Sequence, residues 1–366
     1  TFGKLSAYVD SALHGLDAER AKRRQKRDEL IYYVKKLYYS NLLNADLKEL
    51  LTQTKKAFGE AHDPMQAILD GNVEDIQLGA FLMLLRVKEE TPEELAGFLD
   101  ACRPVCYQAL ESLPDVHLDW PSYAGKKKHH PWYLLAALLL ANQGIRTLLH
   151  GGPAHTPNRV YSDQLLPQLG LPVASSPQEA AVHLDRHGLA YLPLETFCAP
   201  LSHLLTLRYF LGLRSPINTL ARSLNPAKAP LSMQSVFHPA YIELHQGAAD
   251  LAGDQDLLLF KGEGGELEIR PDARTQITGI RHGEHLEGAA VLDNVMPRQS
   301  PPGEPDAQTV LAVWRGEQSD DYGENAVIQT VAVALWGLDR AASLEEAQEL
   351  ARELWQNRER QLIINS

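Results

Sequence analysis

Cysteine is scarce in this sequence, and the few cysteines follow no recognised pattern. The 366 residues include 3 cysteines, Cys102, Cys106 and Cys198, without a CxxC spacing. Three unpatterned cysteines do not form a disulfide framework or a zinc ribbon, which excludes the small disulfide-bonded secreted domains. We therefore expect reduced thiols that pack in the interior.

Long apolar runs are absent as well. The longest, residues 132–141, has about half of the roughly 18 residues that a membrane-spanning helix requires. The first residues show neither the basic segment nor the small-residue cleavage site of a secretory signal. These absences predict a cytoplasmic protein without a membrane partner. The 44% hydrophobic content is typical of a globular chain with a large core.

The sequence lacks the usual motifs for metal or dinucleotide chemistry. RHGEH, residues 281–285, does not have the HExxH spacing of a zinc site. GEGGE, residues 262–266, follows a strand-like run but precedes ELEIR, another strand-like run. A glycine turn fits that context better than a dinucleotide-binding loop, which opens a helix. We expect no metal site, and no Ser/His/Asp arrangement can be identified.

Charge is unevenly distributed along the chain. The net charge of −12 argues against a protein that coats nucleic acid with its whole surface. Residues 20–36, however, contain eight Lys or Arg against two acidic residues, a local charge of +6. Such a segment is either a solvated helix face or a nucleic-acid footprint on an acidic body. Its charge alone leaves both interpretations open.

The hydrophobic pattern of the first third of the chain is helical. Residues 1–110 carry helical stripes and no strand pattern. Within them, residues 71–103 predict two amphipathic helices, and Thr91, Pro92 and Glu94 between them form a capping-box signal. We expect a helical domain over residues 1–110, with a helix from residues 195–220 as an additional candidate member.

From about residue 115 short apolar strands alternate with helices, which is the pattern of a mostly parallel α/β sheet. Strands are expected at 116–120, 145–150, 189–194 and 256–262, and helices at 131–143, 160–170, 177–188 and 241–253. Residues 296–306 form a Pro-rich connector, and two closing helices are expected within residues 324–357. The sequence therefore predicts an α/β domain over residues 111–366.

The most informative stretch is a basic turn, KKKHH at residues 126–130, just before the helix expected from Pro131. A helix N-terminus already carries partial positive charge, so basic side chains crowded there require a compensating anion. In α/β folds the loops at the carboxyl ends of parallel strands bind phosphate groups. Two further stretches, 149–159 and 207–226, add basic side chains. These are His150, His155, Arg159, Arg208, Arg214 and Arg222.

Two interpretations of these basic side chains stay open. Each arginine alone is compatible with a surface ion pair, which contributes little to stability. As a group, they are expected to converge on one anion-binding cleft at the carboxyl ends of the strands. The long, mobile cations of the turn from Lys126 to His130 suit a polyanion lying across a groove better than one diphosphate held in a fixed geometry.

Three segments carry a family resemblance. Residues 71–98 read GNVEDIQLGAFLMLLRVKEETPEELAGF, residues 145–151 read IRTLLHG, and residues 208–226 read RYFLGLRSPINTLARSLNP. They resemble segments of anthranilate phosphoribosyltransferase and its relatives in glycosyltransferase family 3. The resemblance covers roughly residues 70–355. It implies an N-terminal helical domain that mediates homodimerisation beside a larger α/β domain with a mainly parallel sheet.

The sequence departs from that family at its substrate-binding motifs. The Gly-Thr-Gly-Gly-Asp loop, which holds the diphosphate of phosphoribosyl pyrophosphate, is replaced by PSYAG at 121–125, where Pro121 has no N–H and Tyr123 fills space. The Asn-x-Ser-Thr and Lys-His-Gly-Asn-Arg motifs become PWYL at 131–134 and LHGGP at 149–153. The magnesium-binding Asp-Glu pair falls on Leu267 and Glu268. We therefore expect no cofactor and no ordinary anthranilate chemistry.

Loss of these motifs is similar to the YbiB-type branch of the family, which is non-catalytic and binds nucleic acid. The leading hypothesis is a homodimer that binds single-stranded DNA or RNA in basic clefts, largely without sequence preference. Phosphates would contact Lys126, Lys127, Lys128, His129, Arg159, Arg208, Arg214 and Arg222. Bases would stack on Trp132, Tyr133 and Tyr209.

A second hypothesis is a phosphoribosyltransferase or phosphorylase that acts on a different ribosylated substrate. It would use magnesium with phosphoribosyl pyrophosphate, and His150 and Arg208 would orient the acceptor. A small-metabolite sensor or a structural partner protein is the third. The sequence does not choose between DNA and RNA for the leading hypothesis.

Overall fold

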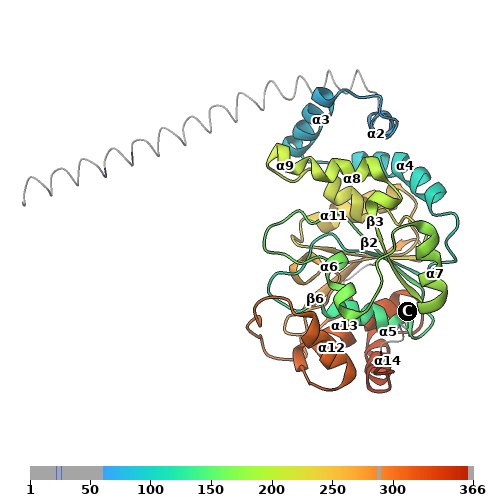
Figure 1. Cartoon of the computed structure of the whole chain (residues 1–366), viewed down its shortest axis with the longest axis vertical. Helices are drawn as coiled ribbons and strands as arrows, with labels where there is room; N and C mark the ends of the chain where they lie inside the picture. The colour runs from blue at the N-terminus through green and yellow to red at the C-terminus, as the bar shows by residue number, and fades with distance from the viewer. Residues whose placement is uncertain (1–21, 23–25, 27–60, 287–289, 362–366) are drawn as a thin grey trace, which may run out of the picture. The chain divides into compact units, whose positions relative to one another are not determined.

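The computed structural model describes residues 61–286 and 290–361, together with Lys22 and Lys26. The chain divides into two compact units, Thr1–Ala57 and Phe58–Ser366, and the second holds every helix and strand labelled in Figure 1. Lys22 and Lys26 are exposed helical residues. The rest of the basic segment 20–36 lies outside the described residues, so its role stays a prediction.

The first described elements are three helices, as the sequence predicts. They are α2 (His62–Leu69), α3 (Asp75–Lys88) and α4 (Pro92–Ala109). The expected capping box is confirmed. Thr91 Oγ1 accepts a hydrogen bond from the Glu94 amide at 3.3 Å, and the Glu94 carboxylate accepts one from the Thr91 amide at 3.2 Å. Pro92 takes the first helical position, where its missing N–H leaves no bond unmade.

Helices from residues 199–222 pack beside these three. They are α8 (Ala199–Thr206), α9 (Arg208–Leu211) and α10 (Ile217–Arg222). Leu201 and Leu204 of α8 and Leu220 of α10 belong to the same apolar cluster as Met65 of α2 and Leu95 of α4. In the described part of the chain, no strand precedes Leu118.

The sheet is mainly parallel, as expected, with the strand order β3-β2-β1-β4-β5-β6-β7 and β8 paired to β6. Its parallel strands are β1 (Leu118–Pro121), β2 (Thr147–Gly151), β3 (Leu189–Pro193), β4 (Leu231–Val236) and β5 (Leu257–Lys261). Three antiparallel strands extend one edge. They are β6 (Thr275–Arg281), β7 (Glu284–His285) and β8 (Ala290–Leu292).

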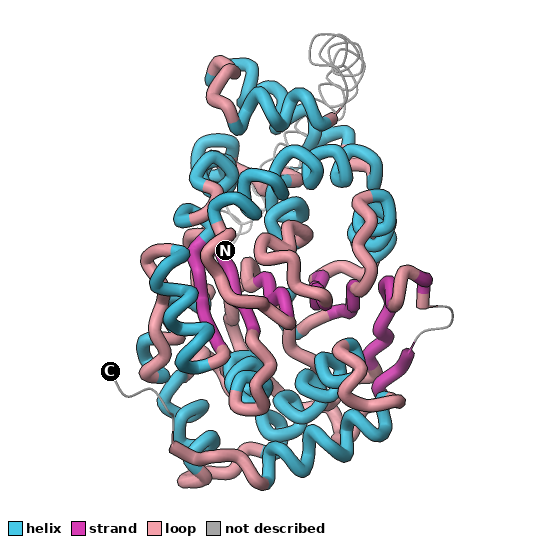
Figure 2. Tube along the Cα trace, turned by 90° about the vertical axis from the view of Figure 1, so that its right-hand side faces the viewer, coloured by secondary structure: helices cyan, strands magenta, loops and turns pink. Residues whose placement is uncertain are grey.

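Helices cover both faces of the sheet (Figure 2). Successive side chains of a strand point to opposite faces, so each strand packs against helices on both sides. In β2, Leu149 packs into the cluster formed with α5, whereas the adjacent Leu148 packs into the cluster of the helical part. One face is covered by α5 (Trp132–Ala141), α12 (Ala307–Arg315), α13 (Asp321–Gly337) and α14 (Leu344–Gln356). The other carries α7 (Pro177–His187) and α11 (Tyr241–Leu251) besides the helical part. The short helix α6 (Ser162–Leu165) follows β2.

Two features of the sheet differ from the sequence prediction. The strand β4 and the antiparallel strands β6 to β8 were not predicted, because their apolar runs are short and broken by polar residues. The strand-like run 266–270 is not a strand. Leu267 and Ile269 are buried as the alternation requires, but Glu266 and Glu268 are fully buried too, so the segment has no solvent face.

The two predictions about thiols and membrane helices can be compared with this structure. Cys102, Cys106 and Cys198 are free and buried, which confirms the packing interpretation. Among the described residues, no helix is long and apolar enough to span a membrane.

One buried arginine links the helical part to the α/β part. Arg103 of α4 pairs with Asp254 through Nη1 and Nη2, at 2.8 and 2.7 Å. The same guanidinium donates to the carbonyls of Ser223 and Leu224, at 3.0 and 3.1 Å. These bonds fix the chain directly after Arg222, one of the predicted site residues.

Candidate functional site

The four predicted arginines meet in one place. Arg159, Arg208, Arg214 and Arg222 line a cavity of about 290 Å³, together with Thr156, Phe237, His238 and the glycine turn at Gly264 and Gly265. We call this cavity the arginine pocket. It lies beyond the carboxyl ends of β1, β2 and β4, where α/β folds bind their ligands. The four arginines therefore lie together around one cavity, and the binding of an anion in it stays a prediction.

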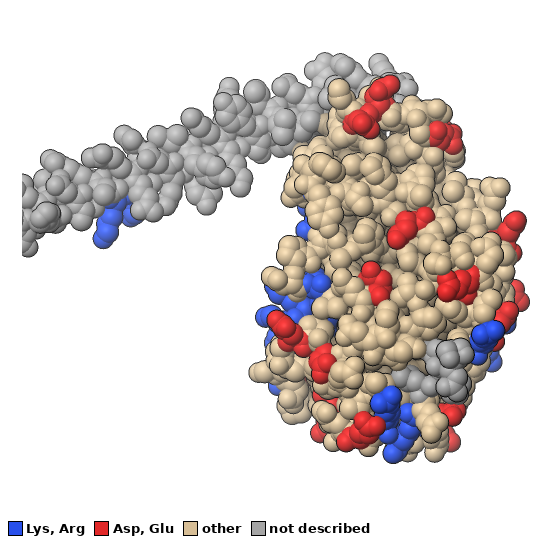
Figure 3. All heavy atoms as spheres, viewed as in Figure 1, with Lys and Arg blue, Asp and Glu red and all other residues tan. Residues whose placement is uncertain are grey.

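No acidic side chain of the described residues forms an ion pair with these four arginines. Arg159 Nη1 donates to the carbonyls of Ala124, Gly125 and Gly264, at 2.9, 2.7 and 2.9 Å. Within the described part of the chain, surface ion pairs, the other interpretation of each arginine, are therefore not found for this group. Lys and Arg also gather along one edge of the described body in Figure 3, while acidic side chains are scattered over the face toward the viewer.

His155 helps to hold two of the arginines. Its Nε2 donates to the carbonyl of Tyr123 at 2.9 Å, so Nδ1 is the acceptor, and Arg208 Nη1 lies 3.0 Å from it. Burial and the adjacent Arg214 lower the pKa of His155 to about 4. Burial and the charges of Arg222 and Arg208 lower the pKa of Arg214 to about 10. Like charges crowded without carboxylates favour a bound anion.

The basic turn is placed differently from the prediction. Lys126 is fully buried, and its Nζ pairs with Glu268 at 2.7 Å and with Glu263. Burial lowers its pKa, but the carboxylates of Glu268 and Glu263 raise it more, so the lysine stays charged. Lys126 is therefore not available to a phosphate. His129 is also wrong as a phosphate contact, because it is 5% exposed and stacks on Tyr322 with ring centroids 4.8 Å apart.

The anion that compensates the helix N-terminus is internal. Glu268 Oε2 accepts a hydrogen bond from the Tyr133 amide, in the first turn of α5, at 3.0 Å. The same carboxylate neutralises Lys126. Lys127 and Lys128 are exposed and stay candidates for phosphate contacts.

A second buried glutamate contacts the loop 121–125, which is expected from the sequence to correspond to the family's diphosphate-binding loop. Glu266 Oε1 accepts from the amides of Ala124 and Gly125, at 2.7 and 2.5 Å. Its Oε2 accepts from Ser122 Oγ at 2.6 Å. Gly125 has a φ of 69°, so the successive amides point into one concavity, which is an anion-binding nest. The chain thus fills its own nest with a carboxylate.

The residues present do not fit magnesium. Leu267 is buried in the core, and Glu268, the remaining carboxylate of the expected metal position, is bound to the Lys126 ammonium. Among the described residues, no group of three or more His, Cys, Asp or Glu could hold a metal ion. Glu263 and Glu266 escaped the sequence analysis, since GEGGE was interpreted only as a glycine turn. Their position directly after β5, near the aligned metal pair, was the available signal.

The remaining predicted residues separate into buried and exposed ones. His150 is fully buried between Asp119 at 3.0 Å and the Tyr123 hydroxyl at 2.8 Å, so it cannot orient an acceptor in the cavity. Trp132 and Tyr133 lie in the core under the sheet, so base stacking on them is wrong. Tyr209 is 65% exposed and stays available.

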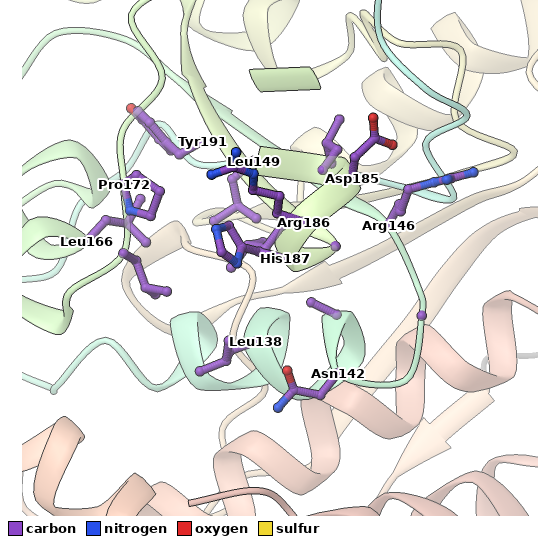
Figure 4. A pocket seen from close by; sticks show the side chains of 16 residues that line it. Leu138, Asn142, Arg146, Leu149, Leu166, Pro172, Asp185, Arg186, His187 and Tyr191 are labelled. Carbon is purple, nitrogen blue, oxygen red and sulfur yellow. The ribbon is translucent and has the colours of Figure 1, made fainter. Parts of the chain in front are cut away.

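A larger cavity of about 440 Å³ lies at the opposite ends of the strands (Figure 4). Arg146 and Gly188, which line it, precede β2 and β3. Its lining includes Leu138 of α5, Leu149 of β2 and Leu184 of α7, together with Arg186 and His187 at the C-terminal end of α7. The charged groups of the arginine pocket do not reach this end of the sheet. The candidate site is therefore the arginine pocket and not this larger cavity.

The helical bundle, the α/β domain and the position of the site define a class of glycosyltransferase-like proteins. Residues 47–105 match the family described as the glycosyl transferase family, helical bundle domain, and residues 133–359 match its a/b domain. The chain belongs to this glycosyl transferase family.

Individual relatives agree with that assignment. The uncharacterized protein YbiB of Escherichia coli (strain K12) is 32% identical over 62% of this chain and 69% of its own length. Anthranilate phosphoribosyltransferase of Thiobacillus denitrificans is 26% identical over 84% of this chain and 91% of its own. The solved anthranilate phosphoribosyltransferase of Thermus thermophilus aligns with a TM-score of 0.66 at 25% identity, covering 81% of this chain and 89% of that one. This protein is thus a homologue of anthranilate phosphoribosyltransferase.

We expect Lys126→Met to destabilise the fold by about 3 kcal/mol, because it leaves two buried carboxylates without their cation. The adjacent, exposed Lys127→Met is the matched control and should change the free energy of unfolding by less than about 0.5 kcal/mol. Urea unfolding at pH 7.5 measures both. Equal stability of the two variants would show that the Lys126 pair contributes nothing.

The stability that Lys126→Met loses should also depend on pH. Burial raises the pKa of Glu268 from 4.5 to about 7, against the opposing effect of Lys126. Glu268 therefore takes up a proton on folding, and this group makes the folded state less stable as the pH rises from about 4.5 to about 7. Without Lys126 the pKa rises further, so the difference between Lys126→Met and the unaltered protein should shrink at pH 5.5.

Proposed function

We propose that this protein binds nucleic acid, predominantly single-stranded and largely without sequence preference, through the arginine pocket. The observation that carries the proposal is the gathering of four guanidinium groups in one solvent-accessible cavity without an acidic partner among the described residues. Unpaired guanidinium groups bind phosphate oxygens with two parallel hydrogen bonds. Phosphate contacts of this kind supply affinity without reading bases.

The aromatic side chains around the pocket support a single-stranded ligand. Phe237, which lines the pocket, is 49% exposed, and Tyr209 is 65% exposed beside Arg208. Exposed aromatic rings next to a basic groove are the usual means of binding single strands, because every base offers a face for stacking. Lys127 and Lys128 would extend the basic surface past the loop that Arg159 holds.

The internal carboxylates argue against diphosphate transfer. Glu266 occupies the amides of the nest at Ala124 and Gly125, and a diphosphate would have to displace a buried, triply hydrogen-bonded carboxylate. The positions for magnesium are likewise filled by Leu267 and by the Lys126–Glu268 pair. A transferase acting on another ribosylated substrate is the second candidate. It is favoured by Arg208, which faces the cavity, and by the activity named for several relatives.

We also propose that the protein is a homodimer through its helical part. On α3, Ile76, Met83 and Val87 recur at helical spacing, and Ile76 and Val87 are 87% and 43% exposed. An apolar stripe of this kind on a surface helix marks a contact surface. Light scattering should give twice the chain mass, and Ile76→Asp should reduce it to one chain. Val182→Asp, at a site on α7 that is 44% exposed, should leave the mass unchanged, and a monomeric unaltered protein would contradict the proposal.

The function is tested by the salt dependence of oligonucleotide binding. Each phosphate contact on a single strand contributes about 0.7 to the slope of log affinity against log salt. Changing Arg208 and Arg214 to Gln together should therefore flatten the slope by about 1.4 on several unrelated sequences. Arg352→Gln, an exposed position on α14, is the control. An unchanged slope, or ordinary turnover of anthranilate with phosphoribosyl pyrophosphate and magnesium, would overturn the proposal.

The filled nest makes a separate prediction. Glu266→Ala removes the internal carboxylate and frees the amides of Ala124 and Gly125 together with Ser122 Oγ. Pyrophosphate should then raise the melting temperature of the variant more than that of the unaltered protein, because bound anion stabilises the folded state. Glu284→Ala, at an exposed site, is the control. If pyrophosphate stabilises both proteins equally, Glu266 does not block the nest.

A further inference from the structure

A second cavity adjoins the arginine pocket. Its volume is about 230 Å³, and it shares Arg214, Arg222, Phe237 and His238 with the arginine pocket. The two cavities are therefore neighbouring compartments on either side of these four residues. The residues that belong to the second cavity alone include Arg86, Glu90, Asn218, Thr219, Tyr241 and His245.

The second cavity differs from the arginine pocket in its chemistry. It contains a carboxylate, Glu90, whose Oε1 accepts a hydrogen bond from Thr219 Oγ1 at 2.8 Å. Arg86 on α3 supplies hydrogen-bond donors, and Asn218 supplies a side-chain amide. A carboxylate repels phosphate, so a phosphate favours the arginine side. A mixed set of donors and acceptors instead suits a group that carries both, as the edge of a nucleobase does.

The boundary between the cavities carries an exposed aromatic ring. Phe237 directly follows β4, is 49% exposed and lines both cavities. The His238 ring meets it edge-on, with centroids 4.7 Å apart. The floor at His245 stays uncharged, because burial and the charge of Arg222 lower its pKa to about 3. An aromatic face beside a neutral floor is suited to stacking a flat heterocycle.

We propose that the second cavity, here called the base cavity, receives one unpaired nucleobase of a strand whose phosphates lie in the arginine pocket. Phe237 stacks on that base, and Glu90 and Arg86 face its hydrogen-bonding edge. The inference rests on the proposed function and deepens it. A base whose edge enters a cavity cannot be paired, so the cavity accounts for a preference for single strands that phosphate contacts alone do not produce.

The test compares a normal oligonucleotide with an abasic strand of the same length and phosphate content, using fluorescence anisotropy and the full chain. The unaltered protein should bind the base-containing strand on the order of tenfold more tightly. Phe237→Ala should remove most of that difference, and Phe237→Tyr should retain it. Phe210→Ala is the matched control, since Phe210 is 85% exposed and lines neither cavity.

The outcomes separate this inference from the proposed function. If both strands bind equally and the change of Arg208 and Arg214 to Gln weakens both, the arginine pocket binds phosphate and the base cavity is refuted. If Phe237→Ala weakens normal and abasic strands by the same factor, Phe237 does not contact a base. If the unaltered protein binds neither strand, the proposed function itself fails.

Discussion

A buried cation that must be neutralised inside the protein organises this site. Lys126 has no exposed surface, and a lysine in that position is tolerated only with carboxylates in contact. Glu268 meets that requirement and at the same time accepts from the first turn of α5, which places the segment 266–270 under the helix N-terminus. Glu266, two residues earlier, is thereby held against the amides of Ala124 and Gly125. The loop, the turn and α5 form one connected ionic unit.

The positively charged side chains near this unit are of two kinds, which differ in whether a carboxylate neutralises them. Lys126 of the basic turn is neutralised by internal carboxylates. In contrast, Arg159 of the cavity is held by carbonyl oxygens, and Arg208 is held by neutral His155. Carbonyls and a neutral imidazole orient a guanidinium without cancelling its charge. An acidic chain with a net charge of −12 can therefore still present a strongly basic cavity.

The chain shares its fold with a family of enzymes, and its basic surface lies beside the nest. The fold is that of the glycosyl transferase family, including solved anthranilate phosphoribosyltransferases. In this chain the nest at Ala124 and Gly125 is filled by the chain's own carboxylate, Glu266. The accessible basic surface lies beside the nest, on α9, α10 and the loop after β2.

The sequence by itself determined the capping box at Thr91, four of the five parallel strands (β1, β2, β3 and β5) and the set of arginines. Periodicity and capping are local, and three of the four arginines lie in one contiguous motif. Only the tertiary structure decided which basic residues are accessible. Lys126 and Lys127 are adjacent and chemically identical, yet one is buried and the other exposed, since the glutamates that bury Lys126 lie more than a hundred residues away. Trp132 and Tyr133 were assigned to stacking because local pattern does not reveal that every side of α5 is covered. Long-range pairing of charge and the packing of a helix on all sides have no local sequence signature. They determine which basic and aromatic side chains are accessible at the site.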